Sequence, residues 1–578
     1  MQYTRRFAIS FSVIFAVAGL FVIWSIAPVL TDKQPVASTK VLARDGSLLY
    51  EVSRTDEGLR TPVKLDRLPK SLVQAVIAAE DARFRSHSGV DWFATLRAVK
   101  NALVRGRATS GASTIEQQLI KNLYFPASRR TVVQKLREMT AAAYWSLALS
   151  KDETLETYLN TVQFGNQANG VQTAALTYFR KDVADLTLAE SSMLAGVIAA
   201  PSAYDPYSHR AAANERRRSV LNRMSEQGMI TPEERDEAVK AEVTIFQPRH
   251  EIRAPHFVFR VLAELESRFP DVRTGGYTIK TTLDPELQSV SEDAVNRRLA
   301  TLAEQRVGDA AAVALDPASG EVLAYVGSAD YFDETIDGAV DMAAAKRQPG
   351  SALKPFMYFT AFMQGFSPGS VVADLPVRFT TADGKSYYPR NYSYKYFGPV
   401  TLRDALASSL NIPAVKVLNE LGLPAFFGSL ARFGLIFPEA PEHYGLGVVL
   451  GGGEVTLTDA VRAYGVLARY GKSVTLRDVF EVSDATGRKV FSPDAVRDPS
   501  AEFIPSPSAQ LGTGFVEGLG RDSRLFDDSA RSEQAAYLIA DILSDKLARS
   551  RSFGEANLLD TGKNLAVKTG TTKDFRDN

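Results

Sequence analysis

Three short motifs in the C-terminal half combine residue types that can form and break an acyl ester. They are Ser351-Ala352-Leu353-Lys354, Ser409-Leu410-Asn411 and Lys568-Thr569-Gly570-Thr571, and each occurs once, in this order. Any one of them alone is also typical of an ordinary helix, or of a strand that ends in a turn. Together, a serine nucleophile, two lysines and an amide side chain predict an acyl-serine site.

Ser351 and Lys354 are the expected nucleophile and base of this site. Residues three apart share one face of a helix, and Pro355 is tolerated only near a helix start. The N-terminus of that helix would favour a serine alkoxide. A free lysine is protonated at neutral pH, so burial and the charge of Lys568 must lower the pKa of Lys354 before it can act as a base. The backbone N–H groups of Ser351 and Thr571 are expected to stabilise the oxyanion.

The other residues of these motifs are expected to handle the substrate. Ser409 and Asn411 would complete the proton path and hold the substrate amide. Residues 567–571 predict the edge of a strand, where Gly570 would let an extended peptide approach closely.

A second group of residues, in the N-terminal half, contains carboxylates and hydrogen-bond donors. Inverting glycosyl transfer needs one carboxylate to take a proton from the attacking hydroxyl and a second group on the departing side. Glu80 and Glu138 are the candidates for these roles. Side chains that could hold a diphosphate or a sugar follow on successive helix faces: Ser113, Thr114, Gln117, Gln118 and Lys121. Any single glutamate here is typical of a solvated helix surface, so the prediction depends on the whole group.

Composition limits the other functions that this chain can have. The 578 residues exceed one hydrophobic core, so two or more domains are expected. Basic and acidic residues balance at 67 each, and a net charge of zero argues against nucleic-acid binding. The absence of cysteine excludes disulfides and thiolate chemistry, and the five histidines lack the close spacing of a zinc site.

An uncharged apolar segment, residues 7–30, follows Arg5 and Arg6. It is long enough to cross a bilayer as a helix, and the two arginines predict a cytoplasmic N-terminus. A cleaved signal peptide is the alternative, but the apolar run is longer than usual for one and no small-residue cleavage site follows it. Residues 92–107 interleave apolar and basic residues at helical spacing, which suits an anionic membrane surface or an ordinary core-facing helix.

The periodicities divide the chain into an anchor, an extended stalk, a mainly helical domain, a linker and an α/β (α+β) domain with an antiparallel sheet. Their ranges are 1–30, 31–65, 66–245, 246–308 and 309–578. A capping box at residues 150–153 marks a helix start in the helical domain. The first hairpin of the last domain is expected at residues 310–326, where a Gly-containing turn joins two β-type runs.

Three segments of the helical domain resemble the peptidoglycan glycosyltransferase domain of class A penicillin-binding proteins. They are Glu80–Asp91, Gly111–Leu123 and Lys151–Asn160. The resemblance implies a lysozyme-like α-helical fold that polymerises lipid II, with undecaprenyl diphosphate leaving. It implies that Glu80 is the general base for the acceptor 4-hydroxyl, and that Glu138 and Lys135 act at the diphosphate.

The same resemblance implies a set of substrate-binding residues and one departure from the family. The set is Asp81, Phe84, His87, Ser113, Thr114, Gln117, Gln118, Lys121 and Lys135. No cofactor is required, although a divalent cation, Mg²⁺ or Mn²⁺, is compatible with the diphosphate site. Gln134 stands where the family usually has an arginine, and Arg129, Arg130 and Arg137 are the candidates to replace that charge.

The region from about residue 309 to the end is similar to the penicillin-binding transpeptidase domain. The resemblance implies that Ser351 attacks a D-Ala-D-Ala stem peptide, releases D-Ala and passes the acyl group to a neighbouring amine. β-Lactams would trap the same serine. Residues 347–350 and 575–577 most resemble the 1C subtype of the family. Since family members continue past the position of Asn578, a C-terminally incomplete domain with an unpaired strand edge is expected.

The leading prediction is a bifunctional peptidoglycan synthase. It would be a single-pass protein of the bacterial cytoplasmic membrane, with its catalytic domains on the outer face. Its partners would be lipid II, the growing glycan, stem peptides, β-lactams and other cell-wall synthesis proteins. The alternatives are a glycosyltransferase whose second domain only binds penicillin or stem peptide, and a D,D-carboxypeptidase or β-lactamase-type hydrolase. The first domain argues against the hydrolase, because a secreted hydrolase needs no site for a lipid-linked sugar.

Overall fold

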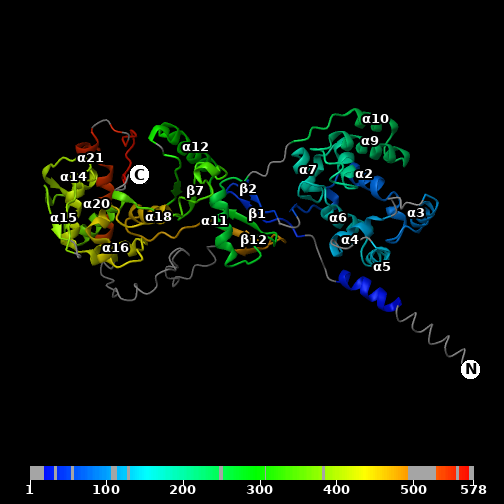
Figure 1. Cartoon of the computed structure of the whole chain (residues 1–578), viewed down its shortest axis with the longest axis horizontal. Helices are drawn as coiled ribbons and strands as arrows, with labels where there is room; N and C mark the ends of the chain where they lie inside the picture. The colour runs from blue at the N-terminus through cyan, green and yellow to red at the C-terminus, as the bar shows by residue number, and fades with distance from the viewer. Residues whose placement is uncertain are drawn as a thin grey trace, which may run out of the picture.

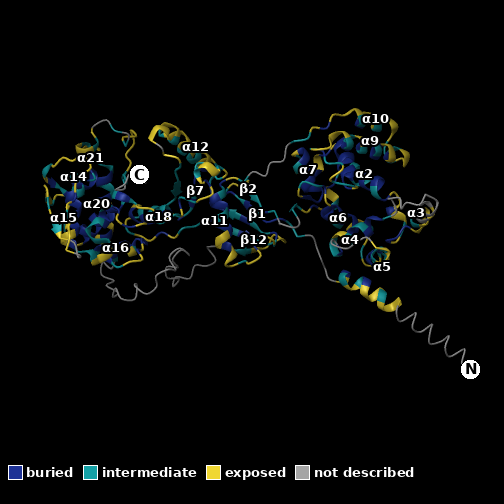
Figure 2. Cartoon of the chain, in the orientation of Figure 1, coloured by how far each residue is buried: buried dark blue, intermediate teal, exposed yellow. Residues whose placement is uncertain are grey.

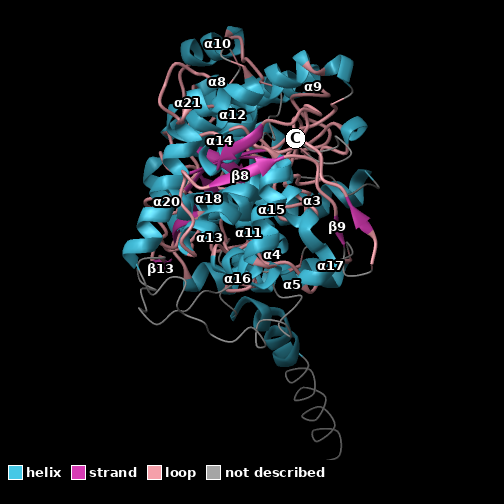
Figure 3. Ribbon diagram, turned by 90° about the vertical axis from the view of Figure 1, so that its left-hand side faces the viewer, coloured by secondary structure: helices cyan, strands magenta, loops and turns pink. Residues whose placement is uncertain are grey.

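A computed structural model describes most of the chain (Figure 1). The described residues are 18–30, 36–53, 58–105, 113–125, 131–246, 252–305, 307–380, 384–492, 529–554, 557 and 559–571. They form a helical N-terminal domain, a small unit around a five-stranded sheet, and a C-terminal domain in which helices again dominate (Figure 1). Figure 3 shows how far helices outweigh strands in the whole molecule.

The N-terminal domain is a bundle of helices in which every residue of α8 after Leu188 is buried. Its helices are α2 (Lys70–Glu80), α3 (Trp92–Arg105), α4 (Ile115–Tyr124), α5 (Val132–Ala148), α6 (Lys151–Thr161), α7 (Val171–Phe179), α8 (Leu188–Val197), α9 (Arg210–Glu226) and α10 (Pro232–Lys240). Helices α2 and α9 pack against α8 and form the core with it (Figure 2). Ser150 and Glu153 form the predicted capping box before α6. The mainly helical prediction for this domain is therefore confirmed.

The stalk and the linker that the sequence predicts are instead parts of one folded unit. The strands are β1 (Lys40–Leu42), β2 (Leu48–Glu51), β5 (Thr278–Thr281), β12 (Val479–Ser483) and β13 (Lys489–Phe491). They form one sheet in the order β13-β12-β5-β1-β2, in which β1 and β5 are parallel and the other neighbours antiparallel. Helix α11 (Pro255–Glu266) adds Phe257 to the core that Val41, Ile279 and Val482 form. In Figure 1 this unit lies between the two larger domains.

The C-terminal domain is built around α13 (Lys354–Met363), every residue of which is buried. The helices around it are α14 (Leu402–Ala407), α15 (Asn411–Leu421), α16 (Leu423–Arg432), α18 (Leu457–Ala468) and α20 (Ser529–Ser544). Phe356 and Phe359 of α13 pack against Phe433, with ring centroids 4.8 and 5.0 Å apart. The predicted hairpin is confirmed, since β6 (Ala312–Leu315) pairs antiparallel with β7 (Val322–Val326).

The antiparallel sheet of this domain is smaller than predicted over the described residues. Apart from β6 and β7, it is represented by two short pairs. These are β8 (Val371–Asp374) with β11 (Gly398–Thr401), and β9 (Phe379–Thr380) with β10 (Ser386–Tyr387). The strand predicted at residues 567–571 is wrong, because Val567 N–H donates to Leu543 O at the end of α20 and not to a neighbouring strand.

Helix α3 confirms the amphipathic helix expected from residue 92. Trp92, Phe93 and Leu96 are exposed on it. Residues 7–17 of the predicted anchor, and Arg107, lie outside the described residues. Within the ranges given above, no helix is both long enough and apolar enough to span a membrane.

Candidate active sites

Glu80 ends helix α2 and is partly buried inside the N-terminal domain. Gln118 of α4 donates from Nε2 to Glu80 Oε2 at 2.8 Å. The other oxygen, Oε1, is buried and meets no hydrogen-bond partner among the described residues. Burial raises the pKa of Glu80, although the hydrogen bond from Gln118 and the charges of Arg216 and Arg223 oppose that rise. A carboxyl with one free oxygen and a raised pKa has the properties of a general base.

Tyr158 of α6 fixes the orientation of Gln118. Its buried hydroxyl donates to Gln118 Oε1 at 2.8 Å. Because Oε1 already accepts this hydrogen bond, Nε2 faces Glu80, and the two hydrogen bonds form one chain. Burial raises the pKa of Tyr158 well above its usual range, so the hydroxyl keeps its proton. Sequence reasoning missed this role, since Tyr158 fits the spacing of an ordinary core residue.

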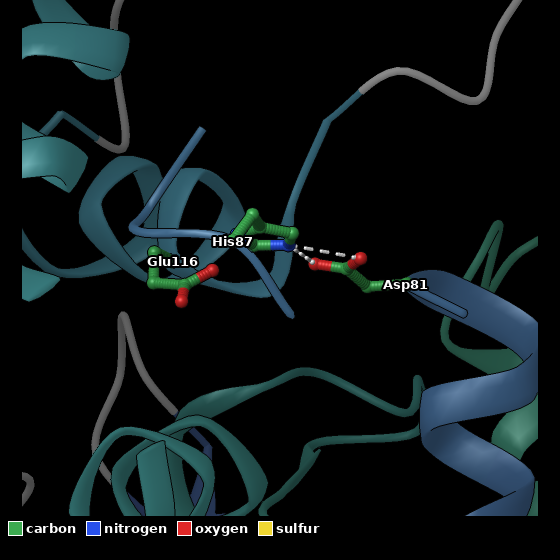
Figure 4. A group of neighbouring side chains, drawn as sticks. All are labelled: Asp81, His87 and Glu116. Atoms are coloured by element: carbon green, nitrogen blue, oxygen red, sulfur yellow. Dashed lines mark hydrogen bonds and ion pairs between the residues drawn. The ribbon is translucent and has the colours of Figure 1, made fainter. Parts of the chain in front are cut away.

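Asp81 and His87, both predicted to bind substrate, are turned towards each other (Figure 4). His87 Nε2 lies 3.1 and 3.0 Å from the two carboxylate oxygens of Asp81. The N–H of Ile115 also donates to Asp81 Oδ2, at 3.1 Å, which ties the start of α4 to the end of α2. These contacts hold the end of α2 and the start of α4 together, and both helices carry site residues.

Glu116 completes a cluster with this pair that resembles a metal site in composition. One oxygen of Asp81, one nitrogen of His87 and one oxygen of Glu116 all lie within 4.8 Å of one another. However, the ammonium of Lys151 pairs with Glu116 and lies 4.4 Å from the ring centroid of the buried Phe84. Lys151 already supplies a positive charge to Glu116 Oε1, so these contacts fit a buried ionic network better than a metal centre, although Glu116 Oε2 has no hydrogen-bond partner among the described residues.

A second polar cluster joins the loop before α4 to helix α5. Lys135 donates from Nζ to Ser113 Oγ at 2.8 Å and lies 3.5 Å from Glu138 Oε2. Burial lowers the pKa of Lys135, while the charge of Glu138 raises it and that of Lys121 lowers it. The structure thus brings three predicted residues into contact, Ser113, Lys135 and Glu138, with the charge of Lys121 nearby. An ammonium, a hydroxyl and a carboxylate in contact are suited to a phosphate, either directly or through a cation.

Two further predicted residues hold the start of α4. Thr114 caps the helix, accepting from Gln117 N at 3.2 Å, and its hydroxyl donates to Gly89 O at 2.7 Å. The amide oxygen and nitrogen of the Gln117 side chain are both buried, and neither has a hydrogen-bond partner in the described part of the chain. Gln117, which is 1% exposed, is therefore enclosed by the fold and does not show the binding role that the sequence predicts for it.

Arg137, a candidate to replace the positive charge that is missing at Gln134, is engaged elsewhere. The guanidinium of Arg137 lies 3.8 Å from the ring centroid of Trp24 and 4.3 Å from that of Phe125. It also donates to Trp24 O at 3.1 Å, so it joins α5 to the helical residues 18–26. Arg129 and Arg130 lie outside the described residues.

In the C-terminal domain two lysines meet at one serine. Lys354 donates from Nζ to Asn411 Oδ1 at 2.6 Å and to Ser409 O at 2.7 Å, and lies 3.4 Å from Ser409 Oγ. Lys568 donates to the same hydroxyl at 2.9 Å. Burial, and then the charge of Lys568, lower the pKa of Lys354 well below its usual value. Burial also lowers the pKa of Lys568, to about 7. The predicted lowering is confirmed, and Lys354 has the properties of a base.

Ser351 lies in the 3₁₀ turn Gly350–Leu353, directly before α13, as the position of Pro355 predicts. The segment that contains Thr571 packs tightly against this turn. A Cβ on Gly350 would lie 2.5 Å from Thr571 N, and a Cβ on Gly570 would lie 2.7 Å from Pro349 O. Gly570 is therefore needed for close approach to the protein's own backbone. The approach brings the amide of Thr571 beside the turn that carries Ser351.

Two buried residues that sequence reasoning missed hold Asn411 in place. Asn391 accepts at Oδ1 from the N–H of Asn411 at 2.9 Å, and it donates from Nδ2 to the two oxygens of Asp374 at 2.8 and 2.9 Å. Helix α15 begins at Asn411 and has no cap from its own N-cap side chain, Leu410. Asn391 thus caps it from a distant loop, a contact that no local spacing predicts.

Comparisons with known proteins bear on both domains. A family model described as Transglycosylase matches residues 45–225, and one described as Penicillin binding protein transpeptidase domain matches residues 310–578. The chain is 33% identical over 500 residues to penicillin-binding protein 2D of Bacillus subtilis (strain 168), covering 83% of this chain and 69% of that protein. It is 29% identical over an alignment of 655 residues to penicillin-binding protein 1A of Neisseria flavescens, covering 95% and 78%.

A solved structure shows the same fold. The crystal structure of penicillin-binding protein 1A from Haemophilus influenzae matches with a TM-score of 0.51 at 23% identity, and covers 80% of this chain and 72% of that chain. The chain belongs to the class A, bifunctional penicillin-binding proteins. It is a peptidoglycan synthase with glycosyltransferase and transpeptidase activities. The relatives named here are of the 1A and 2D types, so the 1C subtype stays a prediction.

Proposed function

We propose that Glu80 and Ser351 carry the two reactions of this enzyme. The observation that supports this assignment is the presence of two catalytic clusters in separate domains of one chain. The first has a buried carboxyl oxygen that no described residue occupies, and the second has two lysines that meet at one serine hydroxyl.

In the first reaction, Glu80 activates the sugar acceptor. Its Oε1 takes the proton of the acceptor 4-hydroxyl. At the same time the hydroxyl oxygen of the acceptor forms a bond to the anomeric carbon of the lipid-linked donor. The bond from this carbon to the diphosphate breaks, and lipid diphosphate leaves. Lys135 and Ser113, in contact at 2.8 Å, hold the diphosphate. Glu138 would hold Mg²⁺ or Mn²⁺ if a divalent cation binds here, and such a cation would neutralise the charge of the leaving group.

In the second reaction, neutral Lys354 takes the hydroxyl proton of Ser351, and the serine oxygen bonds to the penultimate D-Ala carbonyl of a stem peptide. The amides of Ser351 and Thr571 stabilise the oxyanion. The peptide bond breaks, and the proton passes through Ser409 to the amine of the departing D-Ala, with Lys568 hydrogen-bonded to that serine. An amine of a neighbouring stem peptide then attacks the ester and restores the serine. Penicillin acylates the same oxygen.

The chain is anchored at the outer face of the bacterial cytoplasmic membrane, with its N-terminus inside. Arg5 and Arg6 before the apolar residues 7–30 support this arrangement. Exposed apolar side chains gather on three helical segments of the N-terminal domain and the residues before it: Leu20, Ile23, Trp24, Trp92, Phe93, Leu96, Val132 and Val133. Such surface is costly in water and favourable in a lipid headgroup layer.

The test is to separate the two reactions by single substitutions in the full chain. Glu80→Gln should abolish polymerisation of lipid II and retain acylation by penicillin, because the two sites share no residue. Ser351→Ala should abolish acylation and retain polymerisation. Polymerisation that survives in Glu80→Gln would refute the assignment of the base. A wild-type chain that binds penicillin without forming an ester would show a second domain that only binds.

A further inference from the structure

Four tyrosines are exposed within nine residues of the C-terminal domain, in the loop between β10 and β11. Tyr388, Tyr392, Tyr394 and Tyr396 are 58, 73, 74 and 46% exposed. Large aromatic side chains carry much of the binding energy where they gather on a surface, and they are usually covered when they have no partner to bind. Neither catalytic mechanism described above uses these four side chains.

The loop that carries the tyrosines is built on a buried support. Pro389 and Asn391, which alternate with the exposed residues, are buried. Asn391 is held by Asp374, which is completely buried and also accepts from Phe397 N at 2.9 Å. The N–H of Tyr394 donates to Asn391 O at 3.0 Å and closes a turn. The rings are thus presented on a fixed backbone, which lowers the entropy cost of binding a ligand.

The same loop is continuous with the acyl-serine site. Asn411, whose Oδ1 accepts from Lys354, donates from its Nδ2 to Arg390 O at 2.7 Å. Its backbone N–H donates to Asn391 Oδ1. One residue of the catalytic cluster, Asn411, therefore contacts two consecutive residues in the middle of the tyrosine loop.

We propose that the loop at residues 388–396 is a subsite that binds the sugar backbone of a glycan strand while its stem peptide occupies the serine site. This inference rests on the proposed transpeptidase function. Pyranose rings present C–H edges with partial positive charge, which match the negative faces of tyrosine rings, and their hydroxyls match the phenol hydroxyls. A platform of four rings suits a repetitive polymer better than one small ligand.

The charge, composition and size of the loop favour a glycan strand over a lipid surface and over a second copy of the chain. Residues 388–396 contain Arg390 and Lys395 and no acidic residue, which suits a polymer whose stem peptides carry carboxylates. The exposed side chains of the loop are phenols, serines and cations and include no aliphatic residue, unlike a surface that enters lipid. Nine residues are also too few for a stable contact between two copies of the chain, which needs about 800 Å² from each partner.

The test compares a variant with four substitutions, Tyr388→Ser, Tyr392→Ser, Tyr394→Ser and Tyr396→Ser, with the full wild-type chain. The matched control is Tyr537→Ser, an equally exposed tyrosine on α20 of the same domain. The probe is glycan strands freed of their peptides, and the readout is their Kd. The four substitutions should weaken binding by about 30-fold or more, the effect expected for one lost hot spot, and the control should not. Thermal unfolding of each variant checks that the domain is folded.

A second readout separates this inference from the function on which it rests. The ratio of glycan cross-linking to penicillin acylation should fall about tenfold in the variant, because penicillin carries no glycan. Glycan affinity equal to that of the control would overturn the subsite. A loss of affinity for sugar-free stem peptide alone would show that the loop binds peptide and not glycan. A loss of self-association alone would show that the loop binds a second copy of the chain. Failure of wild-type acylation would refute the transpeptidase assignment, while the glycan Kd would still decide the subsite.

Discussion

Replacing Tyr158 by phenylalanine should misorient the general base of the glycosyltransferase. The substitution removes one hydroxyl and leaves Gln118 Oε1 without its 2.8 Å donor. An unsatisfied buried acceptor costs about 1–3 kcal/mol, which the amide can avoid by rotating and giving up its hydrogen bond to Glu80. The orientation of the Gln118 amide that is needed for catalysis then becomes less favourable by this amount. At 1.36 kcal/mol per factor of ten, the rate of polymerisation drops about 5- to 150-fold.

The pH dependence shows whether the effect reaches Glu80. The hydrogen bond from Gln118 lowers the pKa of Glu80, against the rise that burial causes. Losing this bond raises that pKa further. Since the base must be deprotonated, the acidic limb of the kcat/KM profile should move to higher pH in Tyr158→Phe. The assay is polymerisation of lipid II across a pH series.

Tyr178 supplies a matched control in the same domain. It is also fully buried, and its hydroxyl donates to Phe164 O at 2.7 Å without contact to the catalytic carboxyl. Tyr178→Phe should lower the melting temperature without moving the pH profile. An acidic limb of Tyr158→Phe that coincides with that of Tyr178→Phe would refute the orienting role of Tyr158.

Three further predictions concern the remaining groups of the two sites. Lys568→Met removes a charge that lowers the pKa of Lys354, and the pKa of Lys354 should therefore rise. Penicillin acylation should slow most below pH 7, where Lys568 of the wild type is protonated, and stopped-flow acylation at several pH values measures this. Asn391→Ala should slow acylation more than tenfold and lower the melting temperature, because Asp374 loses both hydrogen bonds from Asn391 Nδ2 and α15 loses its cap; unchanged acylation would contradict the support described for the loop. Chelation of divalent cations should slow polymerisation and not acylation if Glu138 holds a cation, and added Mg²⁺ should restore the rate; equal polymerisation with and without chelator would exclude that cation.

The sequence predicted the residues of both sites better than it predicted the structure between them. Ser351, Lys354, Ser409 and Asn411 are recognisable because their motifs are short and local. The structure brings Lys354, Ser409 and Asn411 into contact and places Ser351 in the turn directly before Lys354. The chain of hydrogen bonds from Tyr158 was not predictable, because it joins three helices through side chains whose spacing is that of any helix core.

The interdomain sheet shows the other limit of sequence reasoning. Strands β1, β2, β5, β12 and β13 have three to five residues each, too few to establish an alternating pattern. Their pairing depends on segments far apart in the chain, so residues 31–65 looked like a stalk and 246–308 like a linker. The strand predicted at 567–571 failed for the opposite reason, since a suitable local pattern lacks a partner strand in the described structure.

The most direct measurement is the mass of the intact protein after incubation with penicillin, with Ser351→Ala as the control. The lysine pair at Ser409 and the tight packing of Thr571 on the turn of Ser351 predict a single penicilloyl adduct on the wild-type chain and none on the variant. An unmodified wild-type chain would contradict the account of the second site. An adduct that persists in Ser351→Ala would show that another residue is the nucleophile.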